Sequence, residues 1–444
     1  MATVRCPEGL VFCGPNTLSR GLCVHDQADC NVRSSSARNV PITPEDAIGA
    51  KFAYTEEGLG RHCYYTDTTI KLDFYRSYPD GEPIPDNFSC LTYNIWGLAK
   101  NAKLQRLFGL RQSLLEKTLR GSGADMLCLQ EMSEFSYAKL AGLISEYKFA
   151  SEIPYPAHGT PTAAQRNRGV DVYFLSKYKP SAIYMYGVQG VLGYANALMA
   201  IEYPNLVVFN LYSQAGSKSS PGQQLKWLHY SRCRYDILQT IFDLIKSRPD
   251  SDASRKPMCQ GKQVIVCGDF NFHLDGDLNE WPEMAMIEKY KEDGFVDSFR
   301  QIHTDASAVP GFTEDTDLNI MRWNQKLIDK KYRFDAILYK GHLTPKKSEM
   351  IGLDYECLGQ ADSKWFIENI SEAKEDQRHM LARCAGNKIP INASDHFGVM
   401  TWFGSGRSRG TRRGSRTRGH SIPGSIARSL GSKTRRRASI AGRL

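Results

Sequence analysis

Polar side chains with oxygen and nitrogen donors follow apolar runs at several points along this 444-residue chain. They are Asn94 in LTYNIWG, Glu131 in LCLQEM, Asp269 and Asn271 in VIVCGDFN, Asp335 in YRFDAIL, and Asp395 with His396 in NASDHFG. Carboxylate and amide oxygens carried by rigid strands are ligands that suit Mg²⁺, with Mn²⁺ as its substitute. The set holds no Cys/His cluster, so zinc and copper are not indicated. We therefore expect a magnesium site built from these positions.

The apolar patterning predicts the elements that would carry these donors. The expected strands span 87–95, 125–130, 169–176, 197–203, 206–212, 263–270, 332–340 and 397–403, with strand character also at 64–75. The expected helices span 103–120, 134–147, 224–246 and 283–292. Several strands follow one another directly, which disfavours a doubly wound parallel sheet. The pattern favours an α+β fold with two packed mixed β-sheets flanked by helices, a four-layer α/β/β/α sandwich.

Composition divides the chain into four segments. We expect a Cys-rich N-terminal module and linker at 1–45, an extension leading into the core at 46–87, a catalytic domain at 88–403 and a basic tail at 404–444. The tail consists of Gly, Ser and Arg with little to bury, so it is expected to be disordered.

Cysteine is concentrated near the start of the chain. Cys6, Cys13, Cys23 and Cys30 are spaced C-x6-C-x9-C-x6-C. Zinc sites favour closer pairs, so a small disulfide-linked module, a metal site and ordinary reduced thiols all stay open. The first residues lack the layout of a signal peptide, and no apolar run has the length of a membrane span. We expect an intracellular protein, nuclear if the tail directs it there, or one packaged in a virus particle.

Positive charge is also unevenly placed. The chain has 57 Lys and Arg against 48 Asp and Glu, and residues 404–444 hold twelve of the basic residues and no acidic one. Residues 1–403 thus carry 45 positive and 48 negative charges. Arginine interspersed with glycine and serine favours contact with nucleic-acid phosphates, so nucleic acid is the expected partner of the tail.

The motifs T-x-N-I, QE, GDFN, R-x-D and SDH, in this order over about 88–403, resemble the endonuclease/exonuclease/phosphatase superfamily. The resemblance implies two packed β-sheets with helices outside and metal-dependent hydrolysis of phosphoesters. It implies that Glu131 is the principal metal ligand and that Asn94 lies beside it in the metal and phosphate shell.

The resemblance also implies roles for the remaining positions. Asp269 would orient or deprotonate the attacking water, and Asn271 would hold a phosphate oxygen. Asp395 would fix the tautomer of His396, which would bind the phosphate and stabilise the transition state. Asp335 would support the histidine side of the site.

Two local patterns point to different branches of this superfamily. In VVFNLYSQAG, Tyr212 stands where many members have a histidine, and abasic-site endonucleases are similar in using a tyrosine there. Tyr212 is therefore expected to donate a hydrogen bond to the phosphate. The late segment with T-x-D-T-x-x-N ahead of R-F-D resembles the 5′-tyrosyl-DNA phosphodiesterases, although that group usually has Thr where this chain has Phe270.

The leading hypothesis is a divalent-metal-dependent phosphodiesterase acting on nucleic acid, either a nuclease or a DNA-end-processing enzyme. One alternative is sphingomyelinase-like or inositol-phosphate phosphatase activity on a peripheral lipid substrate. Such an enzyme normally has an apolar membrane-docking loop, for which the sequence shows no clear candidate beyond the aromatic segment 174–194. Another alternative is a non-catalytic nucleic-acid-binding or virion structural protein that retains the fold.

Overall fold

The computed structural model describes residues 11–12, 23–24, 69–97, 99, 101–151, 171–190, 193–216, 227–246, 258–278, 280–319, 321, 330–370, 383–386 and 388–405. Most of the Cys-rich module expected at 1–45, residues 46–68 of the extension and residues 406–444 of the basic tail lie outside these ranges. The expectations about the four N-terminal cysteines and about a disordered tail therefore stay predictions.

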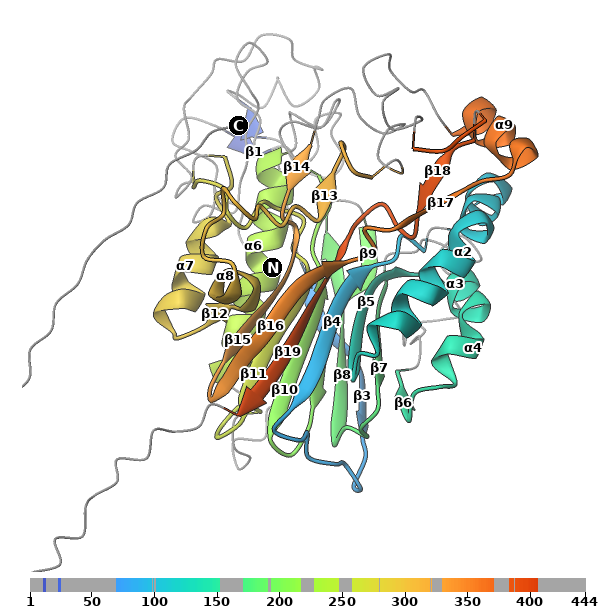
Figure 1. Cartoon of the computed structure of the whole chain (residues 1–444). Coiled ribbons are helices and arrows are strands. Elements are labelled where there is room, and N and C mark those ends of the chain that lie inside the picture. Colours follow the sequence, from blue (N-terminus) through green and yellow to red (C-terminus); the bar gives the residue numbers. More distant parts are fainter. Residues whose placement is uncertain are drawn as a thin grey trace, which may run out of the picture. The chain divides into compact units, whose positions relative to one another are not determined.

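Two large mixed β-sheets pack against each other (Figure 1). The seven-stranded sheet has the order β12 (Val296–Asp297), β15 (Asp335–Lys340), β11 (Gln263–Asp269), β10 (Leu206–Tyr212), β9 (Gly193–Glu202), β8 (Ala182–Gly190) and β3 (Thr69–Ser77). The six-stranded sheet has the order β16 (Leu343–Ile351), β19 (Gly398–Ser405), β4 (Phe88–Asn94), β5 (Met126–Met132), β7 (Asp171–Ser176) and β6 (Phe149–Ala150). Only β10–β11 and β4–β5 pair in parallel within these two sheets.

Helices cover the outer face of each sheet. Those on the six-stranded sheet are α2 (Ala102–Ser122), α3 (Glu134–Lys139) and α4 (Ala141–Ile144), and those on the seven-stranded sheet include α6 (Trp227–Lys246) and α7 (Met284–Glu292). The helices α8 (Ser298–Ile302) and α9 (Gln360–Asn369) complete the set within the described ranges. Figure 1 shows these layers side by side. The predicted four-layer sandwich is thus confirmed, and none of the helices in the described part of the chain could span a membrane.

Within the described ranges, three pairs of short strands form small sheets separate from the two large ones. They are β1 (Val11–Phe12) with β2 (Cys23–Val24), β13 (Glu314–Asp315) with β14 (Lys331–Tyr332), and β17 (Tyr355–Cys357) with β18 (Pro390–Asn392).

Strand alternation sorts the apolar side chains into separate layers. On β4, Cys90 faces the opposite sheet, whereas Leu91 and Tyr93 pack with Phe108 of α2. On β11, Ile265 and Cys267 face the inter-sheet core, and the alternate residues pack beneath α6 and α7. Because side chains alternate along each strand, Asn94 and Asp269 at the strand ends point into the gap between the sheets, as Cys90 and Cys267 do. The site described below occupies that end of the gap.

Several expected elements differ from the structure. The helix expected at 134–147 is two shorter helices that meet at Leu140. The segment 174–194, considered as a membrane-docking loop, instead contributes to β7, β8 and β9, and Ile183, Tyr184 and Met185 are buried in the sandwich. The described part of the segment does not form such a loop, because Ile183 and Met185 face the inter-sheet core and Tyr184 and Tyr186 pack on the other face of the sheet. The strand β16 was missed because its sequence, LTPKKSEMI, is polar and contains proline.

Cysteine takes two forms in the part of the chain that the structure describes. Cys357 and Cys384 form a disulfide across 27 residues of sequence, a pair that spacing alone does not indicate. Five other described cysteines are buried, namely Cys90, Cys128, Cys233, Cys259 and Cys267. Cys90, Cys128 and Cys267 lie in the core between the sheets, with their sulfur atoms within 4.8 Å of one another.

Candidate active site

The predicted site residues meet at one end of the inter-sheet gap. β4, β5, β10 and β11 end there, and β15 and β19 begin there, so the polar residues at these six strand ends come together. Pairing within the seven-stranded sheet places Tyr212 beside Asp269 and Asp269 beside Asp335. Asn94, Asp269, Asp335, Asp395 and His396 are each at most 2% exposed. The arrangement brings ionisable groups together out of water.

Asn94 joins the two sheets at this end. Its Nδ2 donates to Glu131 Oε1 over 3.0 Å and to Asp269 Oδ2 over 2.9 Å. Its Oδ1 accepts from the Trp96 backbone N–H at 2.9 Å, which forms a local turn after β4. The amide therefore orients two carboxylates. That Asn94 Oδ1 contacts a metal directly stays a prediction. An amide oxygen has two lone pairs, and the one that does not accept from Trp96 would be available to the metal.

Glu131 reaches the site through an irregularity in β5. Leu127 and Leu129 face the helices, and simple alternation would aim Glu131 to the same side. The register between β5 and β7 shifts between Leu129 and Met132, and Glu131 has a φ of 55°. A bulge of this kind re-aims a side chain. It turns the Glu131 carboxylate into the gap, where Asn94 meets it.

Tyr212 contacts Glu131 across the gap. Its hydroxyl donates to Glu131 Oε1 over 3.0 Å. Burial and the neighbouring carboxylates, Glu131 first, raise the pKa of Tyr212 well above its ordinary value, so the hydroxyl keeps its proton at neutral pH. In this structure the tyrosine is a hydrogen-bond donor to the predicted metal ligand. The expected contact of its hydroxyl with phosphate stays a prediction.

Asp269 and Asn271 form a compact turn after β11. The Asn271 backbone N–H donates to Asp269 Oδ1 over 2.8 Å, and its Nδ2 donates to Ser213 O over 2.9 Å and to Asp269 Oδ2 over 3.2 Å. Gly268 precedes them with a φ of 146°, and a Cβ there would lie 1.9 Å from Leu211 O. Glycine is thus required for β10 and β11 to approach each other just before this turn.

The histidine of the site is held by a different carboxylate from the one expected. His396 Nδ1 donates to Asp335 Oδ2 over 2.8 Å, and His396 Nε2 lies 3.9 Å from Asp269 Oδ2. The expectation that Asp395 fixes the histidine tautomer is corrected on this point, because Asp335 takes the Nδ1 proton. Asp395 is buried next to His396 in the chain, and Ser394 Oγ lies 3.4 Å from its Oδ1.

Asp335 is itself fixed by the segment that resembles T-x-D-T-x-x-N. Thr313 Oγ1 accepts from the backbone N–H groups of Phe334 and Asp335 at 2.9 and 3.0 Å. Asn319 Nδ2 donates to Ser394 O over 2.9 Å. Neither Thr313 nor Asn319 was singled out for a role from the sequence, although the motif containing them was recognised.

The charges at this end of the gap fit a hard divalent cation. Burial, opposed by nearby His396, raises the pKa of Asp269 to about 8. Ligand atoms of Asp269, Asp335 and His396 all lie within 4.8 Å of one another. In the part of the chain that is described, Oδ1 of Asp335 is buried without a hydrogen-bond partner. A buried carboxylate oxygen without a donor, such as Asp335 Oδ1, would be satisfied by a divalent cation.

Backbone strain is concentrated at the same place. Within the described ranges, the non-glycine residues with positive φ are Trp96, Glu131 and Asn271, at 47°, 55° and 54°. Each belongs to a segment that carries a predicted site residue. Left-handed backbone is unfavourable for Trp and Glu, whereas Asn tolerates it, so the strain lies at Trp96 and Glu131 and persists because surrounding contacts impose it.

Buried arginines hold the loops around the site. Arg234, paired with Glu283, donates to Gln214 O and Gly216 O over 3.0 and 2.6 Å. Arg333, in the R-x-D motif, donates to Asp275 and Asp297 over 2.8 and 2.7 Å. These pairs fix the segments that follow β10 and β11.

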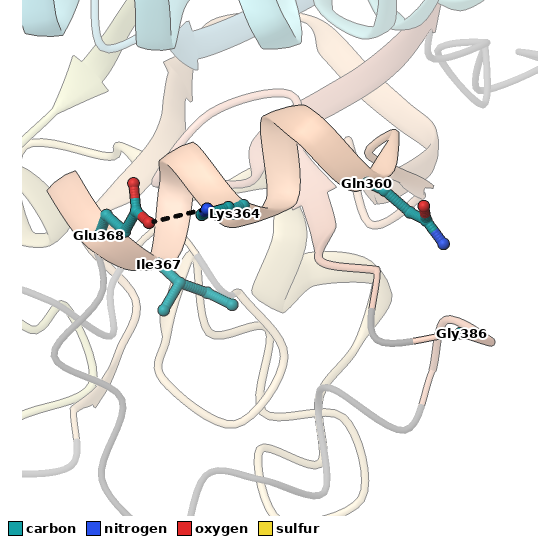
Figure 2. Close-up of a pocket in the computed structure, with 5 residues that line it drawn as sticks. All are labelled: Gln360, Lys364, Ile367, Glu368 and Gly386. Atoms are coloured by element: carbon teal, nitrogen blue, oxygen red, sulfur yellow. Dashed lines mark ion pairs between the residues drawn. The ribbon is translucent and has the colours of Figure 1, made fainter.

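A surface pocket lies elsewhere in the fold. Figure 2 shows that it is formed on α9, where Gln360, Lys364, Ile367 and Glu368 line it together with Gly386. Lys364 pairs with Glu368 at 3.8 Å. The pocket contains none of the residues at the strand ends, so the polar end of the inter-sheet gap is the candidate active site.

Comparison with known proteins agrees with this geometry. The model of the Endonuclease/Exonuclease/phosphatase family matches residues 91–396, which begin before Asn94 and end at His396. No curated protein sequence matches the chain significantly.

Solved structures with a similar chain trace share low sequence identity. D. rerio TDP2 in complex with a single-stranded DNA product has 16% identity and a TM-score of 0.40, over 72% of this chain and 99% of that chain. SmcL has 14% identity and a TM-score of 0.47, over 72% and 99%. The beta toxin from Staphylococcus aureus has 14% identity and a TM-score of 0.43, over 71% and 99%.

Proposed function

The chain belongs to the endonuclease/exonuclease/phosphatase family, and from this premise we propose that it is a divalent-metal-dependent phosphodiester hydrolase acting on nucleic acid. The observation that carries the proposal is the hydrogen-bonded set at the strand ends. Asn94 links Glu131 to Asp269, and His396 is held by Asp335 close to Asp269. Hydrolysis of a phosphodiester needs an activated water, neutralised phosphate oxygens and relief of leaving-group charge.

The proposed mechanism assigns residues to the attacking water and to the phosphate oxygens. Glu131, with Asn94 beside it, would hold Mg²⁺, which when bound supplies positive charge to the phosphate. Asp269 in its ionised form accepts a proton from the attacking water. Asn271 donates to a phosphate oxygen, and His396 stabilises the charge that develops on the phosphorane. Asp335 keeps the Nε2 edge of His396 turned toward the substrate.

The tail and the surroundings of the site support nucleic acid as the substrate class. Residues 404–444 carry twelve basic and no acidic residues, and they would hold a polyanion near the enzyme. The lipid alternative loses its main sequence argument, because the segment 174–194 contributes buried strands to the sandwich. The non-catalytic alternative is disfavoured by the complete set of Asn, Glu, Asp and His side chains.

A panel of substrates tests the proposal. The full chain is assayed with Mg²⁺ or Mn²⁺ on duplex DNA, single-stranded DNA, RNA, a 5′-tyrosyl oligonucleotide, sphingomyelin and a phosphoinositide, with Asp269→Asn as the blank. We expect metal-dependent turnover of a nucleic-acid substrate that EDTA abolishes. Turnover confined to a lipid headgroup would reassign the substrate, and no metal-dependent turnover above the blank would refute the enzyme.

A second experiment tests the role of the basic tail. Removing residues 404–444 is expected to weaken DNA binding and to flatten its salt dependence. The log–log slope on duplex DNA should change by about 0.9 for each phosphate that the tail no longer neutralises. The matched control keeps the length of the tail and replaces its basic residues by glutamine. An unchanged slope in both variants would exclude the tail from substrate binding.

A further inference from the structure

Arg111 is an arginine of α2 that does not face solvent. Its neighbours on the helix, Leu114 and Leu115, belong to the core under the six-stranded sheet, and Arg111 itself is 1% exposed. A charged side chain on an outer helix is ordinarily solvated. The position therefore needs an explanation from its contacts.

The guanidinium of Arg111 donates to three backbone carbonyls. Nη1 donates to Ile95 O over 2.8 Å and to Ala393 O over 2.6 Å, and Nη2 donates to Trp96 O. The rings of Phe108 and Trp96 lie beside the cation, with centroids 4.8 and 5.4 Å from Cζ. The Arg111 side chain is thus hydrogen-bonded to two segments. One contains Ile95 and Trp96, and the other contains Ala393, which lies 282 residues beyond Arg111.

Both segments carry residues of the candidate active site. Ile95 and Trp96 directly follow Asn94, and Trp96 has the left-handed φ of 47°. Ala393 precedes Ser394, whose Oγ donates to Asn94 O over 2.7 Å. His396 lies three residues beyond Ala393. A displacement of Arg111 would therefore move both the Asn94 side and the His396 side of the site.

Arg111 differs from the other buried arginines of the described chain because the carboxylates whose charges act on it, Asp395 and Glu131, lie beyond ion-pair distance. Arg234 pairs with Glu283, and Arg333 pairs with Asp275 and Asp297. Within the described ranges Arg111 forms no ion pair, and its Nε is buried without a hydrogen bond. Burial lowers its pKa to about 10, so it stays charged at neutral pH. Burying an unpaired cation is unfavourable, and hydrophobic packing alone would not select it.

We propose that Arg111 is a positioning residue that locks the segment after Asn94 to the segment before His396, so that metal ligands and phosphate-binding groups keep one relative geometry. The proposal rests on the proposed function. Arginine suits the task because its planar fork donates in several fixed directions at once, whereas lysine is a point charge on a flexible stem. A shift of about 1 Å in a catalytic constellation lowers turnover by as much as 100-fold.

Two substitutions distinguish the contribution of the planar guanidinium of Arg111 from the contribution of its positive charge. Arg111→Lys keeps the positive charge and loses the planar fork, and Arg111→Met loses both. The matched control is Arg106→Met, earlier on α2, where the guanidinium is about half exposed and pairs with Asp362 at 3.1 Å. All variants are made in the full chain and compared by thermal unfolding, steady-state kinetics and calorimetric titration with Mn²⁺.

We expect Arg111→Lys to fold and to lower kcat by on the order of 10²-fold, with KM changed by less than about 3-fold. Binding of Mn²⁺ is expected to weaken by about 10-fold, because the Asn94 and Glu131 side of the site loses its support. Arg111→Met should lose as much activity or more. Arg106→Met should match the wild-type chain in every measurement.

Two results would overturn the proposal. The first is an Arg111→Lys enzyme with kcat and Mn²⁺ affinity equal to those of Arg106→Met, even if its unfolding temperature falls. The second is failure of both substitutions at Arg111 to fold, which would make the residue part of the core rather than of the site. Inactivity of the wild-type chain is a distinct outcome that refutes the proposed function itself.

Discussion

His396 donates a hydrogen bond through Nδ1 to Asp335 Oδ2 over 2.8 Å, across 61 residues of sequence. Asp395, its immediate neighbour in the chain, does not take that proton. The bond leaves Nε2 as the edge that faces Asp269, at 3.9 Å. A carboxylate that holds one nitrogen of an imidazole sets the ring orientation and stabilises its charged form.

Replacing Asp335 is therefore expected to affect catalysis more than replacing Asp395. Asp335→Asn keeps the shape and removes the negative charge, so His396 is neither oriented in the same tautomer nor stabilised when protonated. We expect kcat to fall by on the order of 10²-fold or more, and to fall by less than about 10-fold in Asp395→Asn. Steady-state rates on the substrate identified by the panel give the comparison. A larger loss at Asp395 would restore the assignment made from the sequence.

Tyr212 is expected to act through Glu131. Tyr212→Phe removes only the hydroxyl that donates to Glu131 Oε1 over 3.0 Å. Removing a hydrogen-bond partner of a metal ligand lowers metal affinity or activity by about 10- to 100-fold. We expect the Mg²⁺ concentration for half-maximal activity to rise and KM for the substrate to change little. A rise in KM with unchanged metal dependence would instead place the hydroxyl on the phosphate.

The strands that carry the site could be predicted because the pattern that indicates them lies within a short stretch of sequence. Apolar runs ending in Asn94, Glu131 and Asp269 show both the strand and the residue that follows it. The direction in which each side chain points was harder to predict. The resemblance assigned Asp395, the neighbour of His396 in the chain, as the partner of the histidine, and only the folded chain shows that Asp335 takes that place.

Other features depend on contacts that no local pattern reveals. The turn of Glu131 into the gap requires the bulge against β7, and the burial of Arg111 requires two distant loops to close over α2. A polar strand such as β16 is stable because it pairs along β19, although its own sequence does not favour a strand. In each case the feature depends on tertiary contacts, which the sequence pattern does not show.

His273 provides a prediction about pH. Burial lowers the pKa of His273 from 6.5 to about 4, and its Nδ1 accepts from the Arg333 backbone N–H at 3.1 Å, which needs an unprotonated nitrogen. Between about pH 4 and 6.5 the unfolded chain binds this proton more readily than the folded chain. Stability should therefore fall as pH decreases through that window, by roughly 1–3 kcal/mol from this residue.

The measurement is urea unfolding of wild type and His273→Gln at several pH values across that window and up to neutrality. Glutamine retains an acceptor and does not titrate. We expect the variant to lose less stability than the wild type on acidification. Parallel curves for the two proteins would show that His273 is protonated at no cost to the fold.

The buried pair of Arg234 and Glu283 provides a prediction about stability. Glu283 is 0% exposed and also accepts from Ser231 Oγ over 2.6 Å. Glu283→Ala leaves the Arg234 cation buried without its partner, so we expect a loss of about 3–5 kcal/mol in the free energy of unfolding. Converting both residues to Met and Leu should recover part of this loss. Equal losses in the single and double variants would mean that the carboxylate does not compensate the arginine.

The central claim is that side chains from both sheets form one catalytic site, and rates of three single variants test it most directly. Glu131→Gln, Asp269→Asn and His396→Ala are compared with the wild type in metal-dependent hydrolysis of DNA and RNA, with unfolding temperatures as the control for folding. Each variant is expected to stay folded and to turn over on the order of 10²- to 10³-fold more slowly. Wild-type rates in all three would contradict the account.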